Sequence, residues 1–209
     1  LPSSWHSDLQ KRSDFAGRQW TRGELIAMAL NLGNESNREK LMMGGWSRDD
    51  VGQRPFTEAD IQQLTEMLTT QEWEFIQGLW DTANTLWPDI VEHQKNMNGV
   101  PMEKVESTPF NVKTKDGKTI SLDGGYWPVV YDPTRGGAGS EKGAESAEVA
   151  DAMLKGNFTR ATTSKGHTKS RTKYSAPLLF DFQQIISRHL DNVILDISHR
   201  QFVQQAHSI

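Results

Sequence analysis

The chain has 209 residues, of which 35% are hydrophobic and 24% are charged, and its formal net charge is -4 at pH 7. It contains no cysteine, which excludes disulfides, thiolate nucleophiles and cysteine-ligated zinc. The small negative charge argues against a protein that coats nucleic acid with its whole surface, but it is compatible with a local basic patch.

The length of the chain indicates one domain, with or without an insertion. Its mean hydropathy of -0.64 predicts some long exposed segments. No stretch approaches the roughly 20 apolar residues of a membrane span, and no secretory pattern opens the chain. Residues 1–20 are polar and are expected to form an irregular N-terminal segment. The chain begins at Leu1 and ends in "QFVQQAHSI", and we expect both ends to be cuts in a longer polypeptide.

Two capping boxes predict where helices begin in the first third of the chain. Thr21 is followed three residues later by Glu24, and Thr57 is followed three residues later by Asp60. In this pattern the hydroxyl and the carboxylate satisfy backbone N–H groups at the start of a helix. The helix that begins after Thr21 is predicted to end near Gly33.

Three tryptophans, Trp73, Trp80 and Trp87, recur every seven residues in "EWEFIQGLWDTANTLWP". Such positions lie two turns apart on a helix and drift by only about 20° per step, so they share one face. We predict a helix from about residue 70 to residue 98 that packs this face into the core. The alternative is a surface stripe that docks a partner, because tryptophan is enriched at interface hot spots. The three tryptophans are therefore assigned as core or interface residues.

The sequence after Gly99 favours strands and predicts a β-hairpin insertion within about residues 105–131. Two β-forming runs flank Asp116 and Gly117, and this dipeptide is typical of short hairpin turns. "GGYWPVVYDP" then resembles a strand that leaves a turn. A closing helix is predicted from about residue 181 to residue 206, where apolar residues recur at helical spacing.

A basic loop over residues 155–177 is the best candidate for a direct contact with a ligand. Residues 157–177 contain no acidic side chain. Lysine and arginine side chains, and free backbone N–H groups among serine, threonine and glycine, can bind phosphates. The candidate nucleic-acid or anion contacts are Arg160, Lys165, His167, Lys169, Arg171 and Lys173. A solvated loop that binds nothing is the plainer alternative.

Sequence motifs for catalysis are missing. The chain has no G-x-S-x-G, P-loop or H-E-x-x-H pattern. Asp196 and His199 lie three residues apart on the predicted closing helix and could share a metal. His189 is ten residues from His199, too far to join them without bending, so we expect no metal site. No cofactor and no catalytic residue are expected.

Five stretches, in chain order, resemble a region of very large phage-encoded polypeptides: "ALNLGNESNREKLMMGG", "EWEFIQGLWDTANTLWP", "GGYWPVVYDP", "GHTKSRTKYSAPLLFDF" and "RHLDNVILDISHR". Such polypeptides include internal or ejected virion proteins of podophages and the large polyvalent proteins of phages and mobile elements. The resemblance runs from about Thr21 to Gln204. It implies a module of a multidomain bacteriophage protein that is packaged with, or delivered alongside, DNA. Its expected location is the virion interior, or the host cytoplasm after delivery.

We therefore expect a mainly α fold, in which residues 21–206 form a single mainly helical domain with the hairpin insertion. The expected function is a non-catalytic structural or interaction module. Its partners would be other domains of the parent polypeptide, other virion proteins, or DNA. The alternative is an enzyme with an anion-binding site between the "GGYWPVVYD" strand and the "GHTKSR" loop. Its acid–base and anion-binding groups would be Tyr126, Tyr131, Arg135, His167, Lys169 and Arg171.

Overall fold

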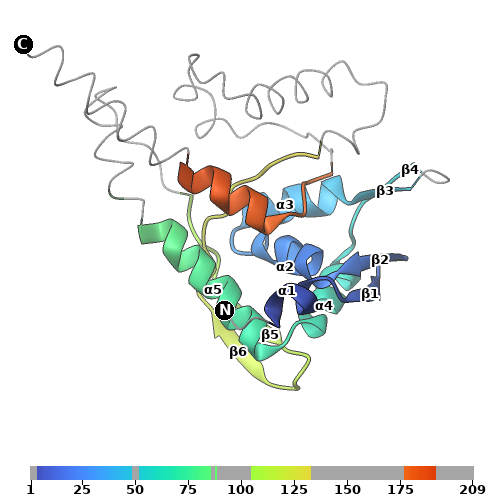
Figure 1. Ribbon diagram of the computed structural model, residues 1–209, viewed down its shortest axis with the longest axis horizontal. Helices are drawn as coiled ribbons and strands as arrows, with labels where there is room; N and C mark the ends of the chain where they lie inside the picture. The colour runs from blue at the N-terminus through green and yellow to red at the C-terminus, as the bar shows by residue number, and fades with distance from the viewer. Residues whose placement is uncertain (1–3, 49–51, 86–87, 89–104, 133–176, 192–209) are drawn as a thin grey trace, which may run out of the picture.

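The computed structural model describes residues 4–48, 52–85, 88, 105–132 and 177–191 (Figure 1). Six helices and three two-stranded antiparallel sheets lie in this part of the chain. In chain order they are α1 (Trp5–Leu9), β1 (Arg12–Phe15), β2 (Arg18–Thr21), α2 (Arg22–Leu30), α3 (Glu35–Gly44), β3 (Trp46–Arg48), β4 (Gly52–Arg54), α4 (Glu58–Met67), α5 (Thr70–Thr85), β5 (Phe110–Lys113) and β6 (Thr119–Leu122). The sixth helix occupies residues 182–191.

The expectation of a mainly α fold is wrong. Of the described residues, 50% are helical and 19% are in strands, which is a mixed α/β class. Two hairpins that the sequence analysis did not predict, β1–β2 and β3–β4, account for the difference. Residues 1–20 are also not irregular throughout, because α1, β1 and most of β2 lie within them.

The β1–β2 hairpin shows why these strands escaped prediction. Phe15 pairs with Arg18, so the turn consists of Ala16 and Gly17, with φ values of 50° and 80°. Two successive positive φ values give the mirror-image turn that matches the twist of paired strands. Asparagine–glycine is the usual signal for this turn, and alanine–glycine is not. The indole N–H of Trp20 donates to the carbonyl oxygen of Phe15, 3.0 Å away, and holds the hairpin closed.

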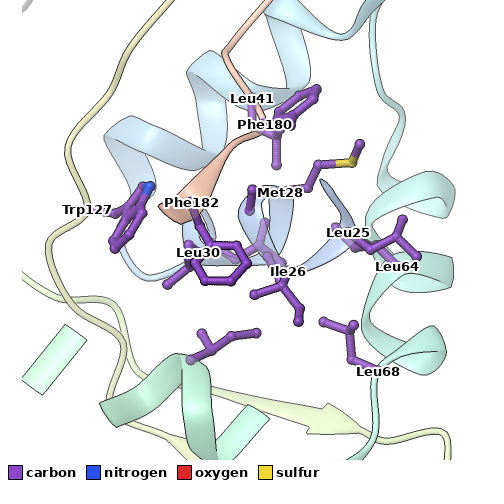
Figure 2. Close-up of a cluster of buried hydrophobic side chains, with 14 of the residues drawn as sticks. Leu25, Ile26, Met28, Leu30, Leu41, Leu64, Leu68, Trp127, Phe180 and Phe182 are labelled. Carbon is purple, nitrogen blue, oxygen red and sulfur yellow. The ribbon is translucent and has the colours of Figure 1, made fainter. Parts of the chain in front are cut away.

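Helix α2 lies at the centre of the fold, with the other helices around it (Figure 1). All six residues from Leu25 to Leu30 are at most 1% exposed. A helix that is apolar on every side is buried on every side. Figure 2 shows the side chains that meet around it, which come from α2, α3, α4, the residue that follows α4 and two later segments: Leu25, Ile26, Met28, Leu30, Leu41, Leu64, Leu68, Trp127, Phe180 and Phe182.

Several local predictions are confirmed. Both capping boxes are formed, so α2 begins after Thr21 and α4 begins after Thr57. Strands β5 and β6 pair as an antiparallel hairpin around the predicted turn. The closing helix begins after Asp181, whose carboxylate accepts a hydrogen bond from the N–H of Gln184 at 2.9 Å, while its predicted end near residue 206 lies outside the described residues.

The tryptophan helix begins at Thr70, where it was predicted. Trp73 and Trp80 are completely buried, and their rings pack edge to face with the ring of Phe110 on β5. These two side chains are therefore part of the core. Trp87 and the predicted end of the helix at residue 98 lie outside the described residues.

Candidate functional site

Most of the candidate contact residues lie outside the described residues. They are Arg135, Arg160, Lys165, His167, Lys169, Arg171 and Lys173, together with Asp196 and His199 of the metal alternative. The structure therefore bears on the basic loop only through the residues that precede and follow it.

The two flanks of this segment meet in an antiparallel ladder. The N–H of Asp132 donates to the carbonyl oxygen of Pro177 at 3.0 Å, and the N–H of Leu179 donates to that of Val130 at 2.8 Å. Tyr131 and Leu178 form an antiparallel bridge between these bonds. Asp132 and Pro177 are thus opposite each other, so the described residues on either side of 133–176 lie side by side.

The "GGYWPVVYD" stretch is not the strand that the sequence predicted, because only Tyr131 in it makes a β-bridge; its backbone is instead tied to the loop that follows α2 and to α3. The carbonyl oxygen of Gly33 accepts the N–H of Gly125 at 2.8 Å. The side-chain amide of Asn34 donates to the carbonyl oxygen of Gly125 at 3.2 Å, and that of Asn37 donates to the carbonyl oxygen of Trp127 at 2.7 Å. Trp127 is completely buried. These groups hold the backbone in place, so their hydrogen bonds have a structural role.

The tyrosines of this stretch are poorly suited to the acid–base chemistry of the alternative enzyme. Burial raises the pKa of Tyr126 to about 12. A general base works best when its pKa is near the working pH, and this shift moves the pKa of the phenol further from neutral pH. The Tyr126 ring lies beside the ring of His189, with centroids 5.9 Å apart. Tyr131 belongs to the ladder with Leu178.

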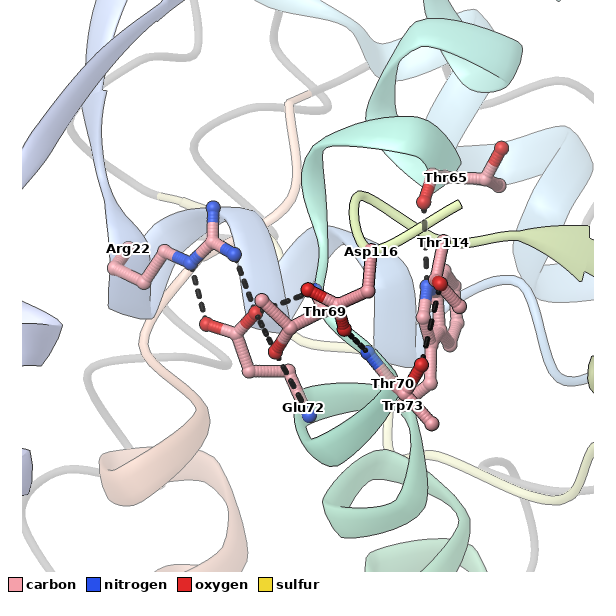
Figure 3. Close-up of polar contacts among 8 residues, drawn as sticks. All are labelled: Arg22, Thr65, Thr69, Thr70, Glu72, Trp73, Thr114 and Asp116. Carbon is pink, nitrogen blue, oxygen red and sulfur yellow. Dashed lines mark hydrogen bonds and ion pairs between the residues drawn. The ribbon is translucent and has the colours of Figure 1, made fainter. Parts of the chain in front are cut away.

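A cluster of polar groups at the start of α5 holds a pair of partly buried charges (Figure 3). The guanidinium of Arg22 donates from Nε and Nη2 to the two carboxylate oxygens of Glu72. These side chains are only 13% and 14% exposed. Glu72 also accepts the N–H and the hydroxyl of Thr69, both at 2.7 Å. The carboxylate of Asp116 accepts the N–H of Thr70 at 2.8 Å.

This cluster caps α5 and joins it to α2, so its charges serve the fold. The sequence analysis did not identify it. Thr69 and Glu72 match the capping-box pattern used for the other two helices, so the cap had a readable signal. The partner Arg22 had none, because it lies 50 residues away from Glu72.

We expect acid to destabilise the protein through Glu72. Burial disfavours its charged form, but hydrogen bonds from Arg22 and Thr69 outweigh this and hold the Glu72 pKa below its ordinary 4.5. Burial likewise opposes ionisation of Asp60, while Thr57 and Arg54 hold the pKa of Asp60 below 3.8. A lowered pKa in the folded state stabilises the fold above the unfolded pKa, and this contribution is lost as pH falls through the folded pKa.

The measurement is the free energy of unfolding in urea between about pH 6 and pH 3. The wild type should lose stability towards the acid end, and Glu72→Gln should lose less of it, because the titrating group is gone. Glu66→Gln, at an exposed position of α4, is the matched control. Identical pH profiles for the wild type and Glu72→Gln would contradict the assignment.

Within the described ranges, no group of three histidine, cysteine, aspartate or glutamate residues could hold a metal ion. In the same ranges, no helix is both long enough and apolar enough to cross a membrane. A comparison with protein-family models, curated proteins and solved structures finds no match.

Proposed function

We propose that this chain is a non-catalytic structural and interaction module of a large phage-encoded polypeptide, and that its basic segment contacts nucleic acid. The phage assignment rests on the resemblance of the five stretches described above. On this proposal the module acts inside the virion, or in the host cytoplasm after it has been delivered with DNA.

The observation that carries the proposal is the backbone pairing of Asp132 with Pro177, the residues on either side of 133–176. The two flanks of residues 133–176 are joined directly by the ladder. The connection holds all five cations of the candidate contact, Arg160, Lys165, Lys169, Arg171 and Lys173. A basic segment anchored at both ends to a folded core can contact a phosphate backbone without rearranging that core.

The alternative enzyme has less support. Among the described residues, the most buried carboxylate–guanidinium pair caps a helix, and burial moves the Tyr126 pKa away from the range of a general base. The module needs neither group for chemistry, because both have a role in packing or capping.

We expect the chain to bind double- and single-stranded DNA with an affinity that falls steeply as salt rises. Replacing Arg160, Lys165, Lys169, Arg171 and Lys173 by glutamine should make the salt dependence shallower, because each phosphate contact contributes about 0.9 to the slope on duplex DNA. Loss of all five contacts would reduce the slope by up to about 4.5. Fluorescence anisotropy with labelled DNA across a salt series measures this directly.

A matched control removes the same number of positive charges from the described surface. Lys11, Arg12, Lys113, Lys115 and Lys118 are exposed residues of the α1–β1 region and the β5–β6 hairpin. Their replacement by glutamine changes the net charge equally and should leave most of the slope intact. Equal effects of the two variants would mean that net charge alone matters, and absence of binding by the wild type would end the nucleic-acid proposal.

The geometry of the ladder allows a cleaner second variant. Since Tyr131 is opposite Leu178, the next pair is Asp132 and Pro177. A short flexible glycine–serine linker can join these two ends in place of residues 133–176, whereas a two-residue turn cannot close because Pro177 has no N–H to donate. This excised chain should fold and should not bind DNA.

A further inference from the structure

Residues 177–191 form a segment that packs on parts of the core far away in the sequence. The side chains of Leu178, Phe180, Phe182 and Ile185 are 1–6% exposed. They alternate with exposed positions such as Asp181 and Gln184. The segment thus has one apolar side, which it buries, and one polar side.

The surface that receives this segment comes from two regions. At its strand end, the backbone of Val130 and Asp132 pairs with that of residues 177–179. Further along, the ring of Phe180 packs edge to face on Trp20 of β2, with centroids 5.6 Å apart. The ring of Phe182 packs edge to face on Phe75 of α5, with centroids 5.9 Å apart. Phe75 in turn contacts Trp5 of α1 at 4.7 Å.

Backbone pairing together with apolar anchors is how folded domains recognise extended peptides and amphipathic helices. Here both modes occur in one segment, since a β-bridge at Leu178 is followed directly by a helix capped by Asp181. Figure 2 shows Phe180 and Phe182 reaching the same cluster as Leu30 and Ile26 of the central helix. The anchors therefore reach the middle of the core.

We propose that the surface formed by β2, α5 and residues 126–132 is a binding site for the chain's own segment 177–191, and that the two pieces stay together when the chain between them is cut. An intact connection makes docking of the segment an intramolecular step, which raises its effective concentration. Cutting removes that advantage and leaves the four buried side chains and the ladder. This proposal is independent of whether the connection binds DNA.

The test begins with the full-length chain carrying a recognition sequence for a specific protease between Gly137 and Ala138. The protein is folded first and cut afterwards. The fragments are expected to elute together on size exclusion at roughly micromolar concentration, with the mass of the uncut chain. They should separate only in denaturant. Separation under native conditions would overturn the proposal, and so would elution of the uncut or cut chain at twice that mass, because the segment would then dock on a second copy.

Matched variants identify what holds the segment. Phe180→Ala and Phe182→Ala each remove a buried aromatic anchor, and each should weaken the association of the cut fragments by roughly a hundredfold or more. Gln183 is an exposed residue of the helix that contains Phe182, and Gln183→Ala should change the affinity of the cut fragments less than about threefold.

A second measurement covers the case in which a variant fails to fold. A labelled synthetic peptide of residues 177–191 is added in excess to the cut wild-type complex. Exchange of the peptide into the complex is the expected result, and failure to exchange after mild denaturant has released the native segment would contradict the proposed site.

Discussion

Trp80→Ala is expected to lower the free energy of unfolding by about 3 to 5 kcal/mol, the usual range for truncating a buried aromatic side chain. Trp80 is completely buried, and its indole N–H donates to the carbonyl oxygen of Leu30 at 3.0 Å. A Cβ on Gly33 would lie 2.5 Å from its Cε2 atom, and one on Gly125 would lie 2.8 Å from its Cγ atom. The ring therefore fills the space where two glycine-bearing loops meet, and neither glycine has a side chain that could fill the cavity left by its removal.

Chemical denaturation monitored by far-UV circular dichroism measures this loss. Trp80→Phe is the control, because it keeps an aromatic ring and removes the hydrogen bond to Leu30, at an expected cost of about 1 to 3 kcal/mol. If Trp80→Ala lost less than about 1 kcal/mol, the side chain would not be a core residue in solution. The surface-stripe alternative for the tryptophans would then return.

The features of the fold that could be predicted are those whose partners lie close in the sequence. Thr21 with Glu24 and Thr57 with Asp60 each place a donor and an acceptor three residues apart, and both boxes are present. The β5–β6 hairpin has its turn signal between its strands. In each case the deciding interaction is local, so a single sequence is enough.

The β1–β2 hairpin could not be predicted because its strands are mostly polar and its turn is unusual. Arg12, Ser13 and Asp14 have little preference for strands. Their conformation depends on burial of Phe15 and Trp20 against the rest of the core. That burial is a tertiary effect, and the nearby sequence does not predict it.

For the candidate site, the sequence composition alone indicates the basic segment, whereas the role of the residues around it depends on tertiary contacts. The tyrosines of "GGYWPVVYD" suggested a catalytic strand. Its backbone is in fact tied to Asn34, 91 residues from Gly125 in the sequence. The same applies to Arg22 and Glu72, whose pairing needs the whole fold to bring them together.

Gly45→Ala is expected to be about as damaging as loss of the tryptophan, for a different reason. Gly45 has φ 50° and ψ -133°, a conformation that a residue with a Cβ adopts only under strain. A Cβ there would overlap the carbonyl oxygen of Arg54 and lie 2.7 Å from the Cα of Pro55. Backbone strain and overpacking each cost about 1 to 3 kcal/mol, so the combined loss should be about 2 to 6 kcal/mol.

The crowding arises because α3 ends against the return strand of the β3–β4 hairpin. The N–H of Gly45 still donates to the carbonyl oxygen of Leu41 at 2.9 Å, while the next residue, Trp46, already pairs with Arg54. The chain thus turns from helix to strand within one residue. The atoms in the way belong to backbone, which cannot rotate aside as a side chain would.

Gly52→Ala, at the start of β4, separates the two causes. Gly52 also has a positive φ, 71°, but a Cβ there would meet nothing within 4 Å. It should therefore cost only the strain, about 1 kcal/mol. Urea denaturation of both variants gives the comparison. If the two losses were equal, crowding against Arg54 would contribute nothing, and the end of α3 would not approach the hairpin this closely in solution.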